Sequence, residues 1–226
     1  MNSKIKKLAC VPYSIYFNFR YLPFKIAKKC PILISPFGDY NISGKIAIEA
    51  DTTSFGMIKI GVSKGSFNLG HDSCYIRVEK DATVRFKGLC QIAKGVKLSA
   101  TKGGVIEFGV NTDLNANCIV SSNSLVSIGD YSWIGWNSVL MDWDGHNIMD
   151  VQSKNIKNNP RPIILERCCW IGANCNVMKG VTLSHHSIVP TRTVLTKSND
   201  TPYAVFGGSP NRILKEGIIR EEFLDK

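Results

Sequence analysis

The chain has 226 residues, of which 44% are hydrophobic and 20% are charged, a balance typical of globular proteins rather than disordered ones. Lysine and arginine outnumber aspartate and glutamate by 28 to 18, which gives a net charge of +10. No stretch approaches the roughly 18 uninterrupted apolar residues of a membrane-spanning helix, and no small-residue cleavage site follows the basic start. We therefore expect a cytoplasmic protein without a signal peptide.

The cysteines are spread along the chain, and no two of them are spaced as C-x-x-C. This spacing excludes zinc-ribbon and thioredoxin-like signatures. Without an export signal, the simplest interpretation is a reducing compartment in which the thiols are buried as small hydrophobic groups. The eight positions are Cys10, Cys30, Cys74, Cys90, Cys118, Cys168, Cys169 and Cys175.

Residues 1–40 combine aromatic and basic side chains and show no repeat. We expect this segment to cap one end of the domain that follows, as the terminal units of repeat proteins do. The same mixture would also suit a weak contact with the inner surface of a membrane. The chain carries no stacking or groove-reading motif, so its positive charge does not indicate a nucleic-acid partner.

Within residues 41–210, apolar and mostly aliphatic side chains recur in steps of six in four series between Val78 and Leu195. A step of six matches neither the 3.6-residue period of a helix nor simple alternation, and it favours short strands joined by tight corners. Glycine follows the aliphatic residue in IGDYSW, IGWNSV and IGANCN, as such a corner requires. Three faces of six residues make an 18-residue coil, and stacked coils give parallel strands about 4.8 Å apart. The longest series is Leu165, Ile171, Val177, Leu183, Val189 and Leu195.

This regularity predicts a parallel β-helix, because a β-sandwich of short strands would not keep one register over six steps. The repeat stops after Leu140 and resumes at Ile163. The intervening residues 141–162 do not fit a coil, so we expect them to project as a loop, and a long loop in a compact domain is usually functional. Residues 211–226, NRILKEGIIREEFLDK, predict a short amphipathic helix at the end of the column.

The hexads with glycine in second place, the histidine in the loop, and the run from WIGANCNVMKGVTL to YAVFGGSPNRIL resemble the hexapeptide-repeat acyltransferases. The resemblance covers about residues 40–215, and within the family the chain is most similar to sugar O-acetyltransferases of bacterial surface-polysaccharide synthesis. It implies an all-β fold, a left-handed parallel β-helix, assembled as a homotrimer. It also implies direct transfer of an acetyl group from acetyl-CoA to a sugar hydroxyl, without a metal ion.

His146, in Trp143-Asp144-Gly145-His146, occupies the position of the family's catalytic histidine. An imidazole can take the proton of an attacking hydroxyl because its pKa lies near neutrality. Asp144 and Asp142 are candidates to orient the ring, although a backbone carbonyl would serve equally. Asn115, in GVNTDLNANCIV, matches an asparagine of the family's active-site cleft, where its amide would bind the acceptor or the developing oxyanion.

The resemblance also implies an acetyl-CoA groove along the C-terminal coils, bordered by Trp170 and by Ala173 beside the pantetheine arm. Thr191 is the equivalent of Ala173 one coil later, although Pro190-Thr191-Arg192 stands where relatives keep glycines. Cations are suited to the phosphates of CoA. The remaining cofactor positions that match the family are Thr196, Lys197, Arg212 and Lys215.

Other functions on the same fold stay open. A zinc enzyme like the gamma-class carbonic anhydrases needs three converging histidines, and the four here (His71, His146, His185 and His186) do not reproduce that family's arrangement. A non-catalytic scaffold would not be expected to keep the loop histidine, the WIG coil and the basic C-terminal segment together. N-acetylation of an amino sugar would use the same base. His185 and His186 are corner residues, substrate contacts or metal ligands; the sequence does not decide among these.

Overall fold

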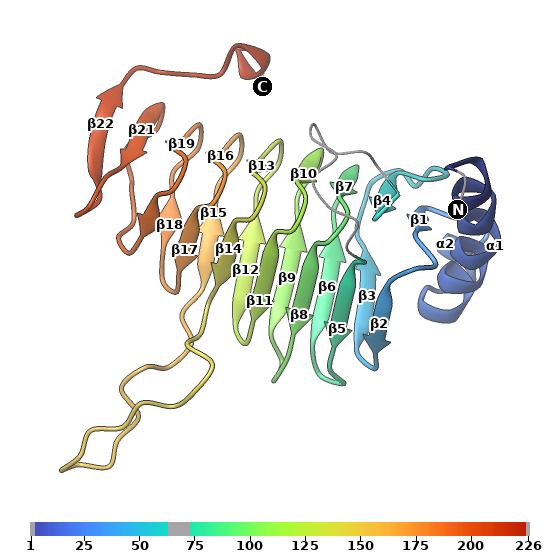
Figure 1. The fold of residues 1–226 in the computed structure, drawn as a ribbon, viewed down its shortest axis with the longest axis horizontal. Coiled ribbons are helices and arrows are strands. Elements are labelled where there is room, and N and C mark those ends of the chain that lie inside the picture. The colour runs from blue at the N-terminus through green and yellow to red at the C-terminus, as the bar shows by residue number, and fades with distance from the viewer. Residues whose placement is uncertain (1–2, 63–72, 225–226) are drawn as a thin grey trace.

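The computed structural model describes residues 3–62 and 73–224, so His71 lies outside the described residues. Short strands wind into a three-sided column with one parallel sheet on each side, as the repeat predicts (Figure 1). Sheet A contains β1 (Ile32–Ile34), β4 (Ile58–Ile60), β7 (Cys90–Ile92), β10 (Thr112–Leu114), β13 (Trp133–Ile134), β16 (Trp170–Ile171), β19 (Ile188–Val189), β21 (Ala204–Gly207) and β22 (Arg212–Glu216).

The other two sheets complete the column. Sheet B contains β2 (Asp39–Ile42), β5 (Tyr75–Val78), β8 (Lys97–Ala100), β11 (Ile119–Ser122), β14 (Val139–Met141), β17 (Asn176–Met178) and β20 (Val194–Leu195). Sheet C contains β3 (Lys45–Ile48), β6 (Thr83–Phe86), β9 (Val105–Phe108), β12 (Leu125–Ile128), β15 (Ile163–Leu165) and β18 (Thr182–Leu183). The first strand begins at Ile32, so the coils start before the predicted boundary at residue 41.

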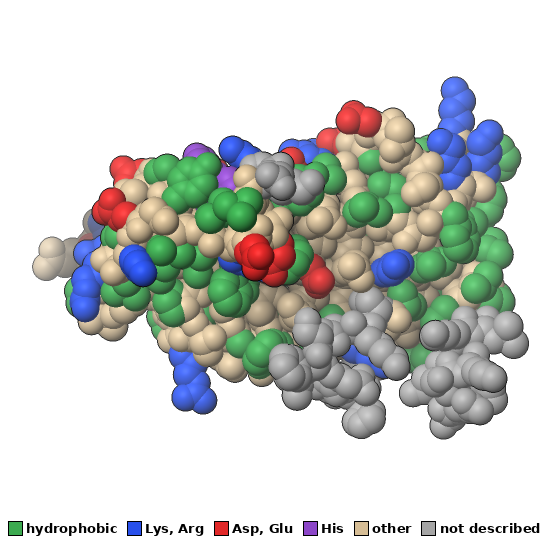
Figure 2. All heavy atoms as spheres, turned by 90° about the horizontal axis from the view of Figure 1, so that it is seen from above, with side chains coloured by type: hydrophobic (Ala, Val, Ile, Leu, Met, Phe, Trp, Pro, Cys, Tyr) green, Lys and Arg blue, Asp and Glu red, His purple; other side chains and the backbone are tan. Residues whose placement is uncertain are grey.

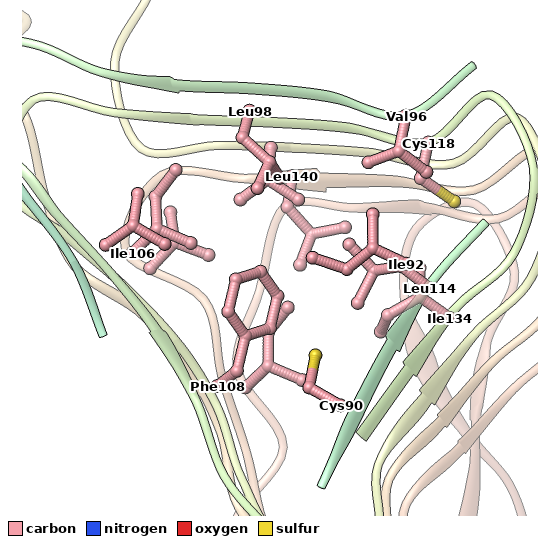
Figure 3. Packing of buried hydrophobic residues seen from close by; sticks show 14 of the residues in the cluster. Cys90, Ile92, Val96, Leu98, Ile106, Phe108, Leu114, Cys118, Ile134 and Leu140 are labelled. Atoms are coloured by element: carbon pink, nitrogen blue, oxygen red, sulfur yellow. The ribbon is translucent and has the colours of Figure 1, made fainter. Parts of the chain in front are cut away.

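The residues of the six-step series form the core. Every member of the series from Leu165 to Leu195 is at least 99% buried. In Figure 3 the side chains of Ile92, Leu114 and Ile134 lie together from successive strands of sheet A. The rings of Phe86 and Phe108 also stack in the core, with their centres 5.2 Å apart. Full burial of one such side chain contributes roughly 1.5–3 kcal/mol.

The prediction of a uniform 18-residue coil is right only near the C-terminus. Ile171 pairs with Val189, 18 residues on, but Leu114 pairs with Ile134 after 20 residues and Ile92 with Leu114 after 22. The longer coils have four-residue strands on sheets B and C, in which two side chains point inward instead of one. A period of six records one inward position per face and therefore misses the second.

Glycine after the aliphatic residue is required because consecutive corners lie close together. A Cβ atom on Gly172 would lie 2.6 Å from the backbone nitrogen of Thr191, and one on Gly135 would lie 2.6 Å from that of Ala173. Heavy atoms cannot approach so closely without a shift of the backbone. Glycine thus permits the stacking of corners between sheets A and B.

Helices α1 (Ser3–Tyr21) and α2 (Phe24–Ala27) lie at the N-terminal end of the column (Figure 1). Side chains of α1 bond to the free edge of β1: Asn18 donates to the carbonyl of Ile32 at 2.7 Å and accepts from its amide at 3.1 Å. The hydroxyl of Ser14 accepts from the amide of Ile34 at 2.9 Å. The helix thereby occupies an edge that would otherwise pair with another chain. No described helix combines the length and apolar character needed to cross a bilayer.

The prediction of a C-terminal helix over residues 211–226 is wrong. Residues Arg212–Glu216 form β22, which pairs antiparallel with β21, and within the described residues of this segment the helical part is a short 3-10 turn at Glu221–Phe223. The last strand of a sheet leaves unpaired backbone groups, and a hairpin satisfies them. Beyond β22 the chain returns along sheet A, where Arg220 and Phe223 contact the ring of Trp133 (Figure 1).

Candidate active site

The predicted loop projects from the corner between sheets B and C, after β14 and before β15 (Figure 1). Its two ends are joined at Asp142, whose carbonyl accepts from the amide of Arg161 at 3.0 Å. The carboxylate of Asp142 is fully buried and accepts from the Ser122 hydroxyl and from the amides of Asn123 and Ser124, at 2.8–2.9 Å. Asp142 therefore fixes the base of the loop and does not orient His146.

His146 is exposed on this loop. Its backbone carbonyl accepts from the side-chain amide of Asn158 at 2.7 Å, and Asn158 accepts from the amide of Ile148 at 2.6 Å. Asn158 thus links the outgoing and returning halves of the loop next to the histidine. Among the described residues the imidazole of this exposed histidine has no hydrogen-bond partner of its own, so neither ring nitrogen is engaged within the described chain.

The structure gives Asp144 a different partner from the one that the sequence suggests. Its carboxylate accepts from the ammonium group of Lys179 and, at 2.9 Å, from the amide of Asn158. The Lys179 hydrogen bond is the main reason why the pKa of Asp144 lies below its usual range. No hydrogen bond joins Asp144 to His146 in the described chain, so Asp144 positions the loop rather than the ring.

Asn115 lies at the end of β10 and is half-buried. Its side-chain amide donates to the carbonyl of Ile134 on the next coil at 3.2 Å. The side-chain oxygen of Asn115 has no donor among the described residues, and this bond does not link Asn115 to His146. The contact is one that an asparagine at a stacked corner makes for structural reasons.

The predicted cofactor residues lie in three places on the last coils. Ala173 and Thr191 are register neighbours at the corner between sheets A and B, because Ile171 pairs with Val189. Thr196 and Lys197 follow β20; the amide and hydroxyl of Thr196 both donate to Asn211, next to Arg212, at 2.8 and 3.2 Å. Most of the predicted cofactor residues thus lie on the last coils, near the C-terminal end of the column.

Trp170 and Lys215 lie on the outer surface of sheet A. Register places them in one row across the sheet, with members Asp113, Trp133, Trp170, Ile188, Val205 and Lys215. Trp170 is 41% exposed, and the guanidinium of Arg220 lies 5.0 Å from its ring centre. Trp170 is therefore not a core residue, and the returning C-terminal segment contacts it.

A surface pocket of about 380 Å³ lies elsewhere, at the corner between sheets C and A. None of the predicted site residues contributes to it, and its lining mixes both charges: Lys87, Glu107, Asp130, Glu166, Arg167 and His185. Within the single chain, the loop histidine and Trp170 are on different sides of the column. One chain alone does not bring His146 to Trp170, whereas Lys197 follows β20 at the same corner as the loop.

Three residues that hold the loop or contact Trp170 were not identified from the sequence: Asn158, Lys179 and Arg220. Lys179 comes directly after β17, whose Met178 pairs with Met141, so it stacks above the base of the loop. The inserted loop separates Met141 from Met178 by 37 residues, which hides this neighbour in the sequence. Adding the loop length to the coil period would have found Lys179; no comparable signal exists for Arg220.

Comparisons with known proteins agree with this geometry, although no family model matches the chain. Over 146 residues, 64% of the chain, it is 31% identical to a polysialic acid O-acetyltransferase of Escherichia coli O1:K1 / APEC, of which 44% is covered. Over 151 residues it is 24% identical to a putative lipopolysaccharide biosynthesis O-acetyl transferase, WbbJ, of Escherichia coli strain K12, covering 63% of the chain and 76% of that relative. The crystal structure of the polySia-specific acetyltransferase NeuO has a TM-score of 0.61 with this fold, at 22% identity over 86% of this chain and 84% of that one.

A parallel β-helix of hexads with one looped-out histidine defines a hexapeptide-repeat protein. The similarities confirm the resemblance that the sequence suggests: the chain is similar to sugar O-acetyltransferases, and its fold is the left-handed β-helix of hexapeptide-repeat proteins. The chain spans less than half the length of the polysialic acid O-acetyltransferase that it matches.

Proposed function

We propose that the chain is an acetyl-CoA-dependent O-acetyltransferase that acts on a sugar hydroxyl in surface-polysaccharide synthesis. The observation that carries the proposal is the exposed, unbonded imidazole of His146 on a loop fixed by Asp142, Asn158 and the Asp144–Lys179 pair. The named sugar O-acetyltransferases among the similar proteins support the acceptor class.

His146 acts as the general base in this reaction. It takes the proton of the sugar hydroxyl as that oxygen attacks the thioester carbonyl, and the imidazolium then returns the proton to the departing CoA sulfur. The C–O bond forms and the C–S bond breaks within one complex of both substrates. Asn115, whose side-chain oxygen is free, binds the acceptor beside this centre.

A covalent acetyl-cysteine is not part of the proposal. Burial raises the pKa of Cys90, Cys118 and Cys169 to about 12, so these thiols stay protonated near neutral pH. The thiolate is the nucleophilic form of cysteine. These core cysteines therefore lack the reactive state that a two-step transfer would need.

The test is His146→Ala, assayed by release of CoA thiol with acetyl-CoA and a panel of neutral, acidic and amino sugars. Loss of a general base is expected to lower the transfer rate by roughly 10²–10⁴-fold, with unchanged CoA affinity. Asn147→Ala, at the exposed neighbouring position, is the matched control and should retain activity. Full activity of the His146 variant would remove the general-base role, and transfer to amino sugars alone would make the enzyme an N-acetyltransferase.

The cofactor residues are tested through the salt dependence of CoA binding. Trp170→Ala should weaken binding to a similar extent at low and high salt, because an indole makes apolar contact with the pantetheine arm. Arg212→Ala and Lys215→Ala should weaken binding mainly at low salt, since exposed charge pairs are screened beyond about 10 Å at 0.1 M. Titration by calorimetry at two salt concentrations measures both effects. Equal behaviour of the three variants would contradict this placement of the cofactor on Trp170, Ala173, Thr191, Thr196, Lys197, Arg212 and Lys215.

A homotrimer completes the proposed site. The histidine loop leaves the corner between sheets B and C, whereas Trp170 is on sheet A, so a second copy is needed to bring one to the other. Light scattering coupled to size-exclusion chromatography should give three times the chain mass of 25.0 kDa. A monomer with full activity would contradict the shared site.

A further inference from the structure

The column covers one face of helix α1 and leaves the other face exposed. Ser14, Phe17 and Asn18 are buried against the first coil. The other face carries Val11, Ile15, Tyr16 and Phe19, which are 44%, 44%, 58% and 48% exposed. A helix that packs on a core normally presents polar side chains to water on its outer face. The outer face of α1 instead exposes four large apolar side chains.

Helix α2 extends this apolar surface. Phe24 is 70% exposed, and its ring centre lies 6.0 Å from that of Phe19. We call the surface formed by Val11, Ile15, Tyr16, Phe19 and Phe24 the α1 outer face. Contiguous exposed apolar surface of this kind marks an interaction site in soluble proteins.

Basic side chains surround the α1 outer face. Arg20, Lys25, Lys28 and Lys29 are exposed beside it, and the chain contains no acidic residue before Asp39. Residues 1–38 hold seven lysines and arginines, so they account for seven of the ten net positive charges of the whole chain. Figure 2 shows hydrophobic and basic side chains together at the end of the column where α1 lies.

We propose that the α1 outer face binds the surface of an anionic lipid bilayer. Apolar and aromatic side chains that enter the headgroup region, flanked by lysines that attract anionic lipids, are the features of an interfacial helix. A second copy of the chain is disfavoured as the occupant because two such faces would bring like charges together. The face lies at the end of the column, so docking leaves the histidine loop and sheet A accessible to substrates. This inference does not depend on the proposed reaction.

The test is flotation of the full chain with vesicles at low salt. Vesicles of phosphatidylcholine and phosphatidylglycerol in equal amounts should carry the chain, whereas phosphatidylcholine alone should carry much less. Binding should decrease in 1 M salt, where the screening length is about 3 Å. Absence of binding to the anionic vesicles, or equal binding to both kinds, would overturn the proposal.

Two variants separate the apolar and the charged parts. Phe19→Ser with Phe24→Ser should lower the partition coefficient by roughly ten-fold or more through lost apolar insertion. Lys25→Gln, Lys28→Gln and Lys29→Gln should lower it by about five-fold per lysine at low salt only. The matched controls are Val151→Ser and the pair Lys154→Gln with Lys157→Gln, which change exposed residues of the distant loop.

Circular dichroism establishes that each variant is folded, and transfer to a soluble sugar should be unchanged in all of them. Loss of binding in the loop controls to the same extent would overturn the proposal, because the effect would then be one of total charge or hydrophobicity. A reduced oligomeric mass of the Phe19/Phe24 variant, without loss of vesicle binding, would assign the face to contacts between copies instead.

Discussion

Asp142 and Asp144 are two positions apart and have different tasks. Asp142 is fully buried, and three donors compensate its carboxylate, as a buried charge requires. Asp144 is partly exposed and pairs with Lys179 from the next coil. A carboxylate near a histidine in sequence is therefore not by itself evidence of a catalytic pair. In this loop both carboxylates hold the backbone that carries His146.

Lys179 is a positioning residue for the proposed reaction, and Lys179→Met tests this role. Removing the ammonium group frees Asp144 and should raise the pKa of that carboxyl back toward its usual value. The loss of stability should be small, about 1 kcal/mol or less, because the pair is partly exposed. The kcat should nevertheless fall by roughly ten-fold, since a displaced imidazole no longer meets the proton of the attacking hydroxyl in the right geometry.

The measurement is steady-state transfer, with kcat and KM determined separately, alongside thermal unfolding. Lys157→Met, an exposed lysine of the same loop, is the control and should leave both unchanged. A variant with normal kcat would show that the Asp144–Lys179 pair does not position the base.

At the scale of elements, the corner after β18 contains a pair of histidines against Tyr203. The Nδ1 atoms of His185 and His186 are 2.8 Å apart, so one ring donates and the other accepts. The ring of His186 stacks on Tyr203 at 4.5 Å, and only 2% of the residue is exposed. Tyr203 leads into β21, so this cluster supports the C-terminal hairpin rather than the histidine loop.

Stability should fall in acid because of His186. Burial lowers the pKa of His186 below its usual value of 6.5, and the nearby Arg167 and His185 act in the same direction. Below about pH 6.5 the unfolded chain therefore binds a proton that the folded chain resists, so the stabilisation present at higher pH is lost as pH decreases. His186→Asn removes the titrating group and suits the backbone, whose φ is +59°.

The measurement is the Tm at pH 8 and at pH 5. The wild-type chain should lose more thermal stability between these values than the His186 variant. His146→Asn, which removes an exposed histidine, should behave like the wild type. Parallel losses in the wild type and the His186 variant would mean that this corner is not the acid-sensitive element.

The elements that the sequence predicts well are those whose pattern has a single cause. The step of six follows from one inward side chain per face, and it places the core residues from Leu165 to Leu195 correctly. The break after Leu140 predicts the loop because 22 residues do not fit a coil. Coil length was mispredicted, because a longer strand adds a second inward residue, such as Ile106 beside Phe108, without changing the series.

Elements set by contacts far apart in the chain were not predictable in the same way. The segment Arg212–Glu216 has residues compatible with a helix, and the free edge of β21 makes it a strand. Asn18 and Ser14 bond to β1 through side chains, a pairing that leaves no periodic trace. The candidate site shows the same division: local sequence identifies His146, whereas its supports Asn158 and Lys179 depend on loop closure and stacking.

At the scale of the whole molecule, the proposed docking face and the candidate active site lie on different parts of the column. The N-terminal end holds most of the net charge and the α1 outer face, while the histidine loop and the predicted cofactor residues belong to the C-terminal coils (Figure 1). Docking of one end therefore does not compete with substrates at the other.

Subunit mixing tests whether neighbouring chains share the site. At acetyl-CoA concentrations too low to saturate the Trp170 variant, His146→Ala and Trp170→Ala chains should each show little transfer as pure trimers. Transfer should recover when they are co-expressed, because a Trp170 variant supplies the histidine and a His146 variant the tryptophan. With random assembly an intact histidine meets an intact tryptophan at about a quarter of the interfaces, so activity should recover to about a quarter of the wild-type value. The same two variants mixed after separate assembly are the control and should stay inactive. If co-expressed chains recover nothing while both variants still form trimers, then each site belongs to a single chain, and the loop must fold back to its own column before it can react.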